Sequence, residues 1–533
     1  MFNNTKYIFV TGGVVSSLGK GIISASIGQL LQARGYKITI QKFDPYINID
    51  PGTLNPYEHG ECYVTVDGME TDLDLGHYER FTGIRTTRNN SITTGRIYQT
   101  VIDKERHGDY LGKTIQVVPH ITDEIKRRIM ATATKEHVDF VISEIGGTIG
   151  DIESAPFMEA IRQLRWELGQ DAVNIHLTYV PYLKAAGEFK TKPTQHSVKE
   201  LQGMGIQPDI LILRTERRLE RPILGKVAMF CNVESDCVVQ SEDLPSIYEV
   251  PVNMHRQGLD NLILRKVRIH TNLSDGDFSA WNRFLQLQHE ATEELHIGLV
   301  GKYDLQDAYK SIRESLHLAA IYNGCKAVIH FIQSEDITPE SVEKQLQGLS
   351  GIVICPGFGQ RGIEGKITTA EYARTHDIPT FGICLGMQMM VIEFARHVLG
   401  YTDADSTEMN PDTQHNVIDI MEEQKHITDM GGTMRLGAYD CALREGSKSY
   451  AIYGQPHIQE RHRHRYEFNN RYLDAFESHG MQCVGRNPDN GLVEIVEMPE
   501  LRWYIGTQFH PEYSSTVLHP HPLFVDFISK AKK

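Results

Sequence analysis

The sequence predicts an α/β fold that is divided into two domains. At 533 residues the chain is too long for one ordinary hydrophobic core. Short β-branched runs alternate along it with helix-length segments, which is the pattern of parallel sheets covered by helices. Two of these runs lead into glycine-rich turns, at residues 7–21 and 296–303. We therefore expect domains at residues 1–266 and 295–533, joined by a linker at 267–294.

Further short apolar runs are expected to form the other strands. They are KITI (37–40), VDFVIS (138–143), NIHLTYV (174–180), DILIL (209–213), GIVICPG (351–357) and TFGICLG (380–386). Most are separated by segments long enough for the helical crossover that parallel strands need. The stretch 266–292 is polar and lacks such runs, which is typical of a linker.

The composition is that of a globular protein, with 40% hydrophobic and 23% charged residues. No run of about 18 uncharged apolar residues is present, so no membrane span is expected. The first residues, MFNNTKYIFV, do not have the pattern of a signal peptide. Eight scattered cysteines without a CxxC pair argue against a disulfide framework or a zinc ribbon. We expect a reduced, cytoplasmic compartment.

The chain is acidic, with a formal net charge of −15 and a pI of about 5.9. It therefore lacks the basic footprint of a nucleic-acid-binding protein. An anion such as a nucleoside triphosphate must be held by local clusters of cations and backbone N–H groups, against the overall field.

A loop suited to phosphate follows the first expected strand. In YIFVTGGVVSSLGKG (7–21), a strand, a glycine-rich turn, Lys20 and a helix follow in the order that cradles an anion. Five residues separate Gly13 from Gly19 instead of the usual four, and Gly21 replaces the usual Ser or Thr. The hydroxyl that normally touches Mg²⁺ is thus missing, so carboxylates must hold the metal. The plainer alternative is an ordinary turn with a surface lysine.

Candidate carboxylates occur in two segments. Asp72 and Asp74 lie in ETDLDLGHYERF, and Glu144 closes the strand VDFVISE. Mg²⁺ takes few protein carboxylates and bridges phosphate oxygens. Glu144 is favoured because ligands of α/β folds bind at the carboxyl ends of the strands. Each acid taken alone is more commonly a solvated surface residue.

A second basic cluster lies in GEFKTKPTQHS, where Pro193 stiffens a loop that we expect to point its polar side chains outward. Its members are Lys190, Thr191, Lys192, Thr194 and Gln195, and Lys226 is a candidate third cation. This composition suits a polyanion. A solvated loop is the equally weighted alternative.

The segment FGICLG (381–386) predicts a nucleophile elbow, in which a strand ends, a tight glycine-flanked turn projects Cys384, and a helix follows. The helix N-terminus favours thiolate over thiol. The N–H of Leu385 and a donor at Gly357 are expected to form an oxyanion hole. The alternative for Cys384 is a buried structural cysteine.

A base for this cysteine is predicted in QFHPE (508–512). In an extended segment His510 and Glu512 face one side, so the carboxylate can orient the imidazole. The combination of GxCxG and HPE favours catalysis over a structural cysteine.

Nearly the whole chain resembles the CTP synthase family. The resemblance rests on VTGGVVSSLGKG, QKFDPYINIDPGT, ETDLDLGHYERF, SEIGGTIGDIES, FKTKPTQHS, GICLGMQ, RHRHRYEFN and TQFHPE. It implies an N-terminal P-loop-type, parallel-sheet amidoligase domain (1–266) and a C-terminal class I glutaminase domain (295–533). The elbow alone would indicate only an amidotransferase.

The resemblance also implies roles for individual residues. Binding of ATP is implied for Ser17, Leu18, Gly19, Lys20, Gly21, Ile22, Asp74, Arg214 and Leu244, and of Mg²⁺ for Asp74 and Glu144. Contacts with UTP or CTP are implied for Ser16, Asp151, Ile152, Glu153, Lys190, Thr191, Lys192, Pro193, Thr194, Gln195 and Lys226. Glutamine binding is implied for Gly357, Leu385, Gly386, Met387, Gln388, Glu408 and Arg465, around the catalytic Cys384, His510 and Glu512.

By the same resemblance, the expected reaction is the ATP-dependent amination of UTP to CTP with ammonia from L-glutamine. Mg²⁺ is the expected metal, GTP an activator through the segment 357–366, and CTP an inhibitor. The expected partners are these small molecules, without nucleic acid or membrane, and the expected assembly is a homotetramer.

Two alternatives are weighed against this reading. Another two-part amidotransferase, such as a cobyrinate-amidating enzyme, would act on carboxylates. A filament-forming or regulatory relative would have no activity. The KTKPTQ loop favours a nucleotide over the first, and the presence of Lys20, Glu144, Cys384, His510 and Glu512 argues against the second.

Overall fold

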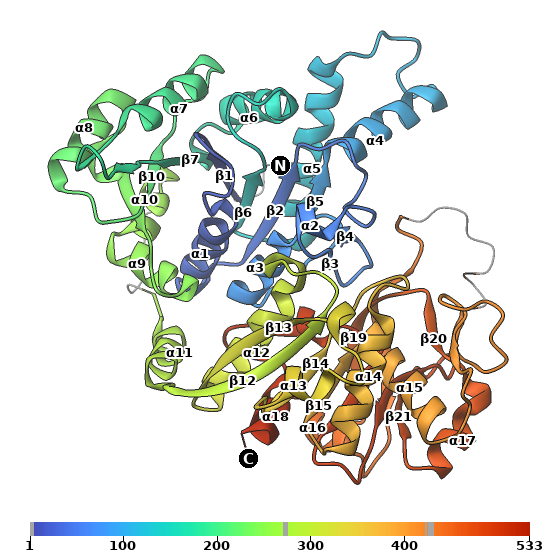
Figure 1. Cartoon of the computed structure of the whole chain (residues 1–533). Coiled ribbons are helices and arrows are strands. Elements are labelled where there is room, and N and C mark those ends of the chain that lie inside the picture. Colours follow the sequence, from blue (N-terminus) through green and yellow to red (C-terminus); the bar gives the residue numbers. More distant parts are fainter. Residues whose placement is uncertain (1–4, 270–275, 422–423, 425–430, 533) are drawn as a thin grey trace. The chain divides into compact units, whose positions relative to one another are not determined.

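The computed structural model describes residues 5–269, 276–421, 424 and 431–532 (Figure 1). The chain forms two compact units. Unit 1 comprises residues 1–50 and 74–282, and unit 2 comprises residues 51–73 and 283–533. Each unit contains a sheet with parallel strands and flanking helices, so the predicted α/β class is confirmed.

Unit 1 is built on a seven-stranded sheet in the order β11-β10-β7-β1-β6-β2-β5. Every neighbouring pair in it is parallel. The strands are β1 (Lys6–Gly12), β2 (Ile38–Asp44), β5 (Ser91–Thr93), β6 (Phe140–Ile145), β7 (Ala172–Tyr179), β10 (Ile210–Thr215) and β11 (Val238–Glu242). Most of their residues are buried, as expected for strands covered on both faces.

Helices cover both faces of this sheet. They are α1 (Lys20–Ala33), α3 (Asp74–Thr82), α4 (Thr94–His107), α5 (Thr122–Glu136), α6 (Ala155–Leu168), α7 (Lys192–Gly203), α8 (Arg221–Cys231), α9 (Val250–Arg256) and α10 (Leu259–Lys266). Apolar side chains of α4, α5 and α6 pack with Phe9, Phe43 and Val141 of the sheet in one buried cluster. A short hairpin, β8 (Tyr182–Leu183) and β9 (Glu188–Phe189), precedes α7.

Unit 2 contains a nine-stranded mixed sheet in the order β13-β12-β14-β15-β23-β22-β21-β18-β19. The first five strands are parallel and the rest antiparallel. Their bounds are β12 (Glu293–Gly301), β13 (Cys325–Gln333), β14 (Gly351–Ile354), β15 (Thr380–Ile383), β18 (Arg435–Leu443), β19 (His457–His464), β21 (Gln482–Arg486), β22 (Val493–Glu497) and β23 (Tyr504–Thr507).

Two buried clusters flank the parallel part of this sheet, one containing α12 and α18, the other α14 and α15. The helices are α12 (Lys310–Tyr322), α13 (Val342–Leu346), α14 (Ile363–Thr375), α15 (Leu385–His397), α16 (Lys448–Tyr453), α17 (Leu473–Ser478) and α18 (Pro522–Ala531). Smaller elements are α2 (Pro56–His59), β3 (Tyr63–Val64), β4 (Glu70–Thr71), β16 (Asp405–Ser406), β17 (Asn416–Ile420) and β20 (Tyr466–Phe468).

Three further expectations concern the linker, the cysteines and membrane spans. Within the segment expected to be a linker, residues 279–290 form helix α11 (Ser279–Glu290), and residues 270–275 lie outside the described residues. All eight cysteines are free thiols. No helix in the described part of the chain is both long enough and apolar enough to cross a membrane.

One buried ion pair fixes the end of α1. Arg34, which follows the helix, donates from Nε and Nη2 to Asp260 of α10 at 2.8 and 2.6 Å. Both side chains are almost fully excluded from solvent. Removing the cation from a buried carboxylate is costly. His255, whose Nδ1 lies 3.1 Å from the same oxygen of Asp260, offers one hydrogen bond where Arg34 donates two. The position of α1 therefore depends on this pair.

We expect Arg34→Ala to lower the stability of unit 1 by about 3–5 kcal/mol, because Asp260 would stay buried without its guanidinium. Differential scanning calorimetry would show this as a lower unfolding temperature. The control is Arg162→Ala, which removes an ion pair with Glu159 that is 43% and 31% exposed and should lower the unfolding temperature much less. Equal shifts for the two variants would contradict the role given to Arg34.

Candidate functional site

The loop after β1 leads directly into the N-terminus of α1. Val14, Ser17 and Gly19 have positive φ angles of 82°, 57° and 89°, which turn the chain sharply. Gly19 occupies the N-cap position and no side chain caps the helix. The first N–H groups of α1 are thus available to an anion. Lys20 begins the helix and donates from Nζ to the carbonyl of Gly147 at 2.7 Å.

Gly21 stands where the usual phosphate loop has a hydroxyl residue, and the structure gives a reason. A Cβ at this position would lie 2.2 Å from Oδ1 of Asp74. The carboxylate of Asp74 therefore occupies the space next to Gly21, and a larger residue would displace it. A carboxylate thus lies beside the position where the hydroxyl is missing.

Lys42 joins the two predicted metal ligands. Its Nζ lies 3.2 Å from Oε1 of Glu144 and also forms a hydrogen bond with Asp74, the first residue of α3. Lys42 and Glu144 are paired neighbours on β2 and β6. Asp44 is 3.9 Å from the same ammonium, and the hydroxyl of Tyr78 donates to Glu144. Three carboxylates thus converge on one positive charge.

Burial and charge compete in this cluster. Burial raises the pKa of Glu144, and the nearby Lys42 only partly offsets it. Burial acts in the same direction on Asp74, but the charge of Lys42 and its hydrogen bond, together with the charges of His77 and Lys20, outweigh it and the pKa is lowered. Burial also lowers the pKa of Lys20. The two carboxylates therefore differ in basicity although they share one cation.

Lys42 was not predicted from the sequence as a site residue. The signal was present, because a lysine inside an otherwise apolar buried strand needs a charged partner. Its partners could not be read from the sequence, since Asp74 and Glu144 are distant from it along the chain.

The KTKPTQ segment begins α7, and the structure corrects one expectation about it. Thr191, Thr194 and Gln195 are buried instead of pointing outward. Thr194 donates from Oγ1 to the carbonyl of Tyr179 at 3.0 Å, and Gln195 donates to Thr191 at 3.1 Å. They are buried because the first turn of the helix packs against the end of β7.

The cations of this region are more accessible. Lys190 lies 2.5 Å from Glu188, and Lys192 and Lys226 are exposed. The pKa of Glu188 is lowered mainly by the hydrogen bond from Lys190, with a smaller effect of the charge of Lys226. Lys190 and Lys226 therefore both act on the carboxylate of Glu188. Pro193 lies in the first turn of α7.

The other predicted nucleotide contacts lie in several elements and loops of unit 1. Asp151 accepts a hydrogen bond from the N–H of Thr148 at 2.7 Å, and Ile152 is 87% exposed. Arg214, in β10, bonds to the carbonyl of Ser241 at 3.2 Å. The remaining positions are mostly at the surface of loops or at helix starts: Ser16, Ser17 and Glu153 are exposed, Ile22 and Leu244 are half-buried, and Leu18 is buried.

Cys384 lies at a strained turn between β15 and α15. Its φ of 53° and ψ of −106° are unusual for a residue with a side chain. Gly386, two residues later, has no room for a Cβ, which would lie 2.0 Å from the carbonyl oxygen of Ile354. The thiol is buried, and its Sγ lies 3.7 Å from the carbonyl of Arg463 and from Nε2 of Gln508.

His510 follows β23, the parallel neighbour of β15, so the two strand ends bring it towards Cys384. Its Nδ1 lies 2.7 Å from Oε1 of Glu512. Its buried Nε2 has no hydrogen-bond partner among the residues that the structure describes. Burial alone would lower the pKa of His510, but the charges of Glu512 and Cys384 outweigh it and raise the pKa to about 10. The imidazole is therefore held protonated at neutral pH.

A cavity of about 170 Å³ lies over this pair and is lined by Gly357, Cys384, His510, Glu512 and residues of the 51–62 segment, all within unit 2. Glu408 accepts from the N–H of Gly359 at 2.8 Å. Among the other predicted glutamine contacts, Leu385, Gly386 and Met387 are buried in α15. Gln388 donates to the carbonyl of Tyr466 at 2.8 Å. Arg465 donates to Gln424 and Thr433 at 2.7 and 2.6 Å.

Two residues near the cavity were not identified from the sequence. Arg463 donates from Nε to Glu70 at 2.8 Å and from Nη2 to the carbonyl of Gly52 at 3.1 Å. Lys302 donates to the carbonyl of Phe358 at 2.8 Å, and burial lowers its pKa to about 7. Arg463 belongs to the RHRHR run, where only Arg465 was singled out.

Two family models match the chain, one in each half. Residues 6–269 match the family model described as the CTP synthase N-terminus. Residues 304–530 match the class I glutamine amidotransferase model. A synthetase-type unit joined to a class I amidotransferase unit is thus the class of protein defined by the fold and the sites.

Relatives that match over almost the full length of the chain identify the family within this class. A CTP synthase of Bacteroides thetaiotaomicron is 68% identical over 529 residues, covering 99% of this chain and 98% of that protein. One from Porphyromonas gingivalis is 64% identical over 531 residues, covering 99% and 98%. A solved glutaminase domain of a Trypanosoma brucei CTPS with bound acivicin is 36% identical, covering 45% of this chain and 94% of that one, with a TM-score of 0.43. The chain belongs to the CTP synthase family.

We expect Glu512→Gln to lower the pKa of His510 from about 10, because the carboxylate is the largest influence that raises it. The protonated form would then be lost at a lower pH. An NMR titration of the His510 ring, assigned by its absence in His510→Gln, measures the midpoint. Glu294→Gln, at an exposed position of the same unit, is the matched control. An unchanged midpoint in Glu512→Gln would show that Glu512 does not set the charge of His510.

Proposed function

We propose that this protein is a glutamine-hydrolysing CTP synthase, which aminates UTP to CTP at the expense of ATP. The observation that carries the proposal is the presence of both sites in one chain that is 68% identical over 529 residues to a relative named CTP synthase. Unit 1 would carry out the ATP-dependent step and unit 2 the hydrolysis of glutamine.

In unit 1, ATP would transfer its γ-phosphoryl group to O4 of UTP, which converts a poor leaving group into a good one. The N–H groups at the start of α1 and the ammonium of Lys20 would hold the phosphates, while Lys42 would offset charge beside Glu144. Arg214 and Leu244 would flank the adenine. The basic cluster of Lys190, Lys192 and Lys226 would hold the triphosphate of UTP.

Mg²⁺ fits the carboxylates of this unit. Asp74 and Glu144 already converge on one cation, the ammonium of Lys42, and carboxylate oxygens are the ligands that Mg²⁺ prefers. Asp74 and Glu144 would hold the ion, which when bound neutralises charge on the phosphates.

In unit 2, the thiolate of Cys384 would attack the amide carbon of glutamine, and His510 would give a proton to the leaving ammonia. The N–H of Leu385 and the backbone at Gly357 would stabilise the oxyanion. Water would then hydrolyse the thioester to glutamate and regenerate Cys384. The released ammonia would displace phosphate from C4 of the activated UTP.

Regulation and assembly are proposed from the family resemblance. GTP would activate through residues 357–366, where Arg361 bonds to Glu335 at 2.7 Å and to the carbonyl of Lys302 at 2.8 Å. CTP would inhibit by occupying the triphosphate site of UTP. The assembled enzyme would be a homotetramer.

Cys384→Ala is expected to abolish CTP formation from glutamine while leaving formation from added ammonium intact, because only the first route needs a thioester. The ammonium-dependent rate should rise with pH as more free NH₃ becomes available. CTP formation is followed spectroscopically with each nitrogen source. Cys325→Ala, a buried cysteine of the same unit, is the control.

Lys20→Ala provides the complementary outcome, since both routes need phosphorylated UTP and both should be lost. The division of labour would be wrong if Cys384→Ala still used glutamine, or if it folded normally and lost both routes.

If CTP and UTP share one triphosphate site, raising the UTP concentration should relieve inhibition by CTP competitively. Lys226→Gln should then raise the KM for UTP and the inhibition constant for CTP together. Lys184→Gln, at an exposed lysine of the same unit, should change neither. Steady-state kinetics at several UTP concentrations measure both constants. Inhibition that is insensitive to UTP would place CTP elsewhere.

A further inference from the structure

A basic cavity lies at the edge of the unit 1 sheet, and none of the residues proposed to bind ATP or UTP lines it. It has a volume of about 150 Å³ and is bounded by the turn before β5 and by helices α4 and α5. Its lining residues are Arg88, Asn89, Ile92, Arg96, Arg127, Arg128, Ala131, Thr132 and Lys135. Five of these nine are cations and none is acidic. One water needs about 10–15 Å³ by the same measure, so the cavity is large enough for a polyatomic ligand.

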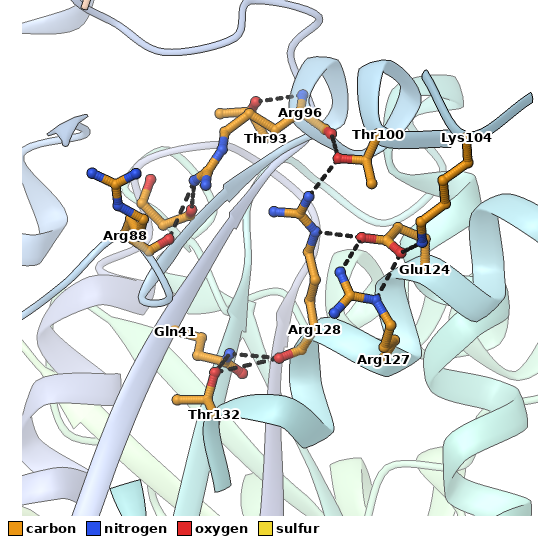
Figure 2. Close-up of polar contacts among 11 residues, drawn as sticks. Gln41, Arg88, Thr93, Arg96, Thr100, Lys104, Glu124, Arg127, Arg128 and Thr132 are labelled. Carbon is orange, nitrogen blue, oxygen red and sulfur yellow. Dashed lines mark hydrogen bonds and ion pairs between the residues drawn. The ribbon is translucent and has the colours of Figure 1, made fainter. Parts of the chain in front are cut away.

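Two of the arginines are fixed by one buried carboxylate, as Figure 2 shows. Glu124 accepts from Nε and Nη2 of Arg127 at 2.8 and 2.5 Å and from Nε of Arg128 at 2.9 Å. Lys104 approaches the same group at 3.0 Å. Burial alone would raise the pKa of Glu124, but these hydrogen bonds outweigh it and lower the pKa to about 2.

The contacts with Glu124 fix the guanidinium groups of Arg127 and Arg128 but leave some of their N–H donors without a hydrogen-bond partner within the described residues. Arg128 also donates from Nη2 to Thr100 at 2.8 Å. Its Nη1 and the Nη1 of Arg127 have no hydrogen-bond partner within the described ranges. Since the single charge of Glu124 faces three cations, this side of the cavity keeps an excess of positive charge and of donors.

The opposite side is fixed by neutral acceptors. Arg96 donates from Nη1 to the carbonyls of Ser91 and Arg88 at 2.6 and 3.2 Å. Thr93 caps α4 by accepting from the N–H of Arg96 at 3.2 Å. The amide of Gln41 bridges the carbonyls of Asn89 and Arg128 at 3.3 Å each, and Figure 2 shows the contact with Arg128. The turn and α5 are thus tied together beneath the cations.

An ordinary solvated basic surface would not show these features. Surface cations usually alternate with acids, and like charges held together in a concave wall repel one another. Here five cations gather in a chain whose net charge is −15. Several are held in fixed geometry, so little rotamer entropy remains to be lost when a ligand binds.

We propose that this cavity is a binding site for a compact phosphate-bearing anion, recognised by its phosphate groups. Planar guanidinium groups match phosphate oxygens in geometry and charge. The apolar lining is limited to Ile92 and Ala131, and no aromatic ring is available to stack on a base. The phosphate groups therefore supply the recognition, whether the ligand is inorganic or the phosphate end of a nucleotide.

Pyrophosphate is the probe for this site, titrated by calorimetry into the full-length protein at low salt. The test variant is Arg88→Gln/Lys135→Gln, because both residues are exposed and line the cavity. The matched control, Arg106→Gln/Lys113→Gln, removes two exposed cations of the same unit outside the cavity. Unchanged unfolding temperatures without ligand establish that both variants fold.

We expect the wild type and the control to bind pyrophosphate at the cavity with the same affinity. In Arg88→Gln/Lys135→Gln the affinity of this binding component should fall on the order of tenfold or more. This component should persist in Lys20→Ala, which removes a cation of the proposed ATP loop, and should weaken as salt is added. Identical titrations of the test variant and wild type would overturn the proposal. So would loss of the same component in Lys20→Ala.

Titration with ADP distinguishes the two sources of the anion. Equal affinity of the cavity component for pyrophosphate and ADP would indicate an inorganic ligand, and a tighter ADP component would indicate a nucleotide. Both outcomes support recognition of the ligand through its phosphate groups. Binding of ADP at the cavity without binding of pyrophosphate would overturn the proposal.

Discussion

The buried ammonium of Lys42 is the interaction on which the site of unit 1 depends. The parallel register of β2 and β6 places it beside Glu144, and it also holds Asp74 at the start of α3. Without it, these carboxylates would repel one another in a buried setting, and burial would favour their neutral forms. The position of Asp74 in turn requires glycine at residue 21, because a Cβ there would occupy the place of its carboxylate. One positive charge thus links a strand, the start of a helix and the end of the glycine-rich loop.

Unit 2 likewise brings its candidate site residues together at the ends of parallel strands. Cys384 and His510 follow the neighbouring parallel strands β15 and β23, and Gly357 follows β14. Side chains at the carboxyl ends of adjacent parallel strands meet although they are distant in sequence. Glu512 then keeps the buried imidazole protonated, which suits a partner for a thiolate and a proton donor for a leaving amine. Geometry comes from the sheet, and reactivity comes from the pairing of buried charges.

Local patterns predicted the parts of these sites that are local in sequence. The glycine-rich turn before Lys20 and the GxCxG elbow need a short segment only, and the structure has the expected strand, turn and helix at both. Lys42 and Arg463 were missed because their roles depend on carboxylates that only the folded sheet brings close. The outward orientation expected for Thr191, Thr194 and Gln195 was wrong because composition does not reveal which face of α7 meets β7.

The segment 51–73 has a consequence for dividing the protein into pieces. It is flanked on both sides by sequence of unit 1, yet it belongs to unit 2, where the fully buried carboxylate of Glu70 is paired with Arg463. Tyr63 donates to the carbonyl of Tyr513 at 2.9 Å, and Glu61 accepts from the N–H of Ser311 at 2.8 Å. A fragment beginning near residue 295 would lack residues 51–73, part of which line the Cys384 cavity. A fragment ending near residue 266 would contain residues 51–73 but not Arg463, the partner of Glu70. A cut between residues 266 and 295 therefore does not separate the two units, because residues 51–73 of unit 2 would stay with the N-terminal fragment.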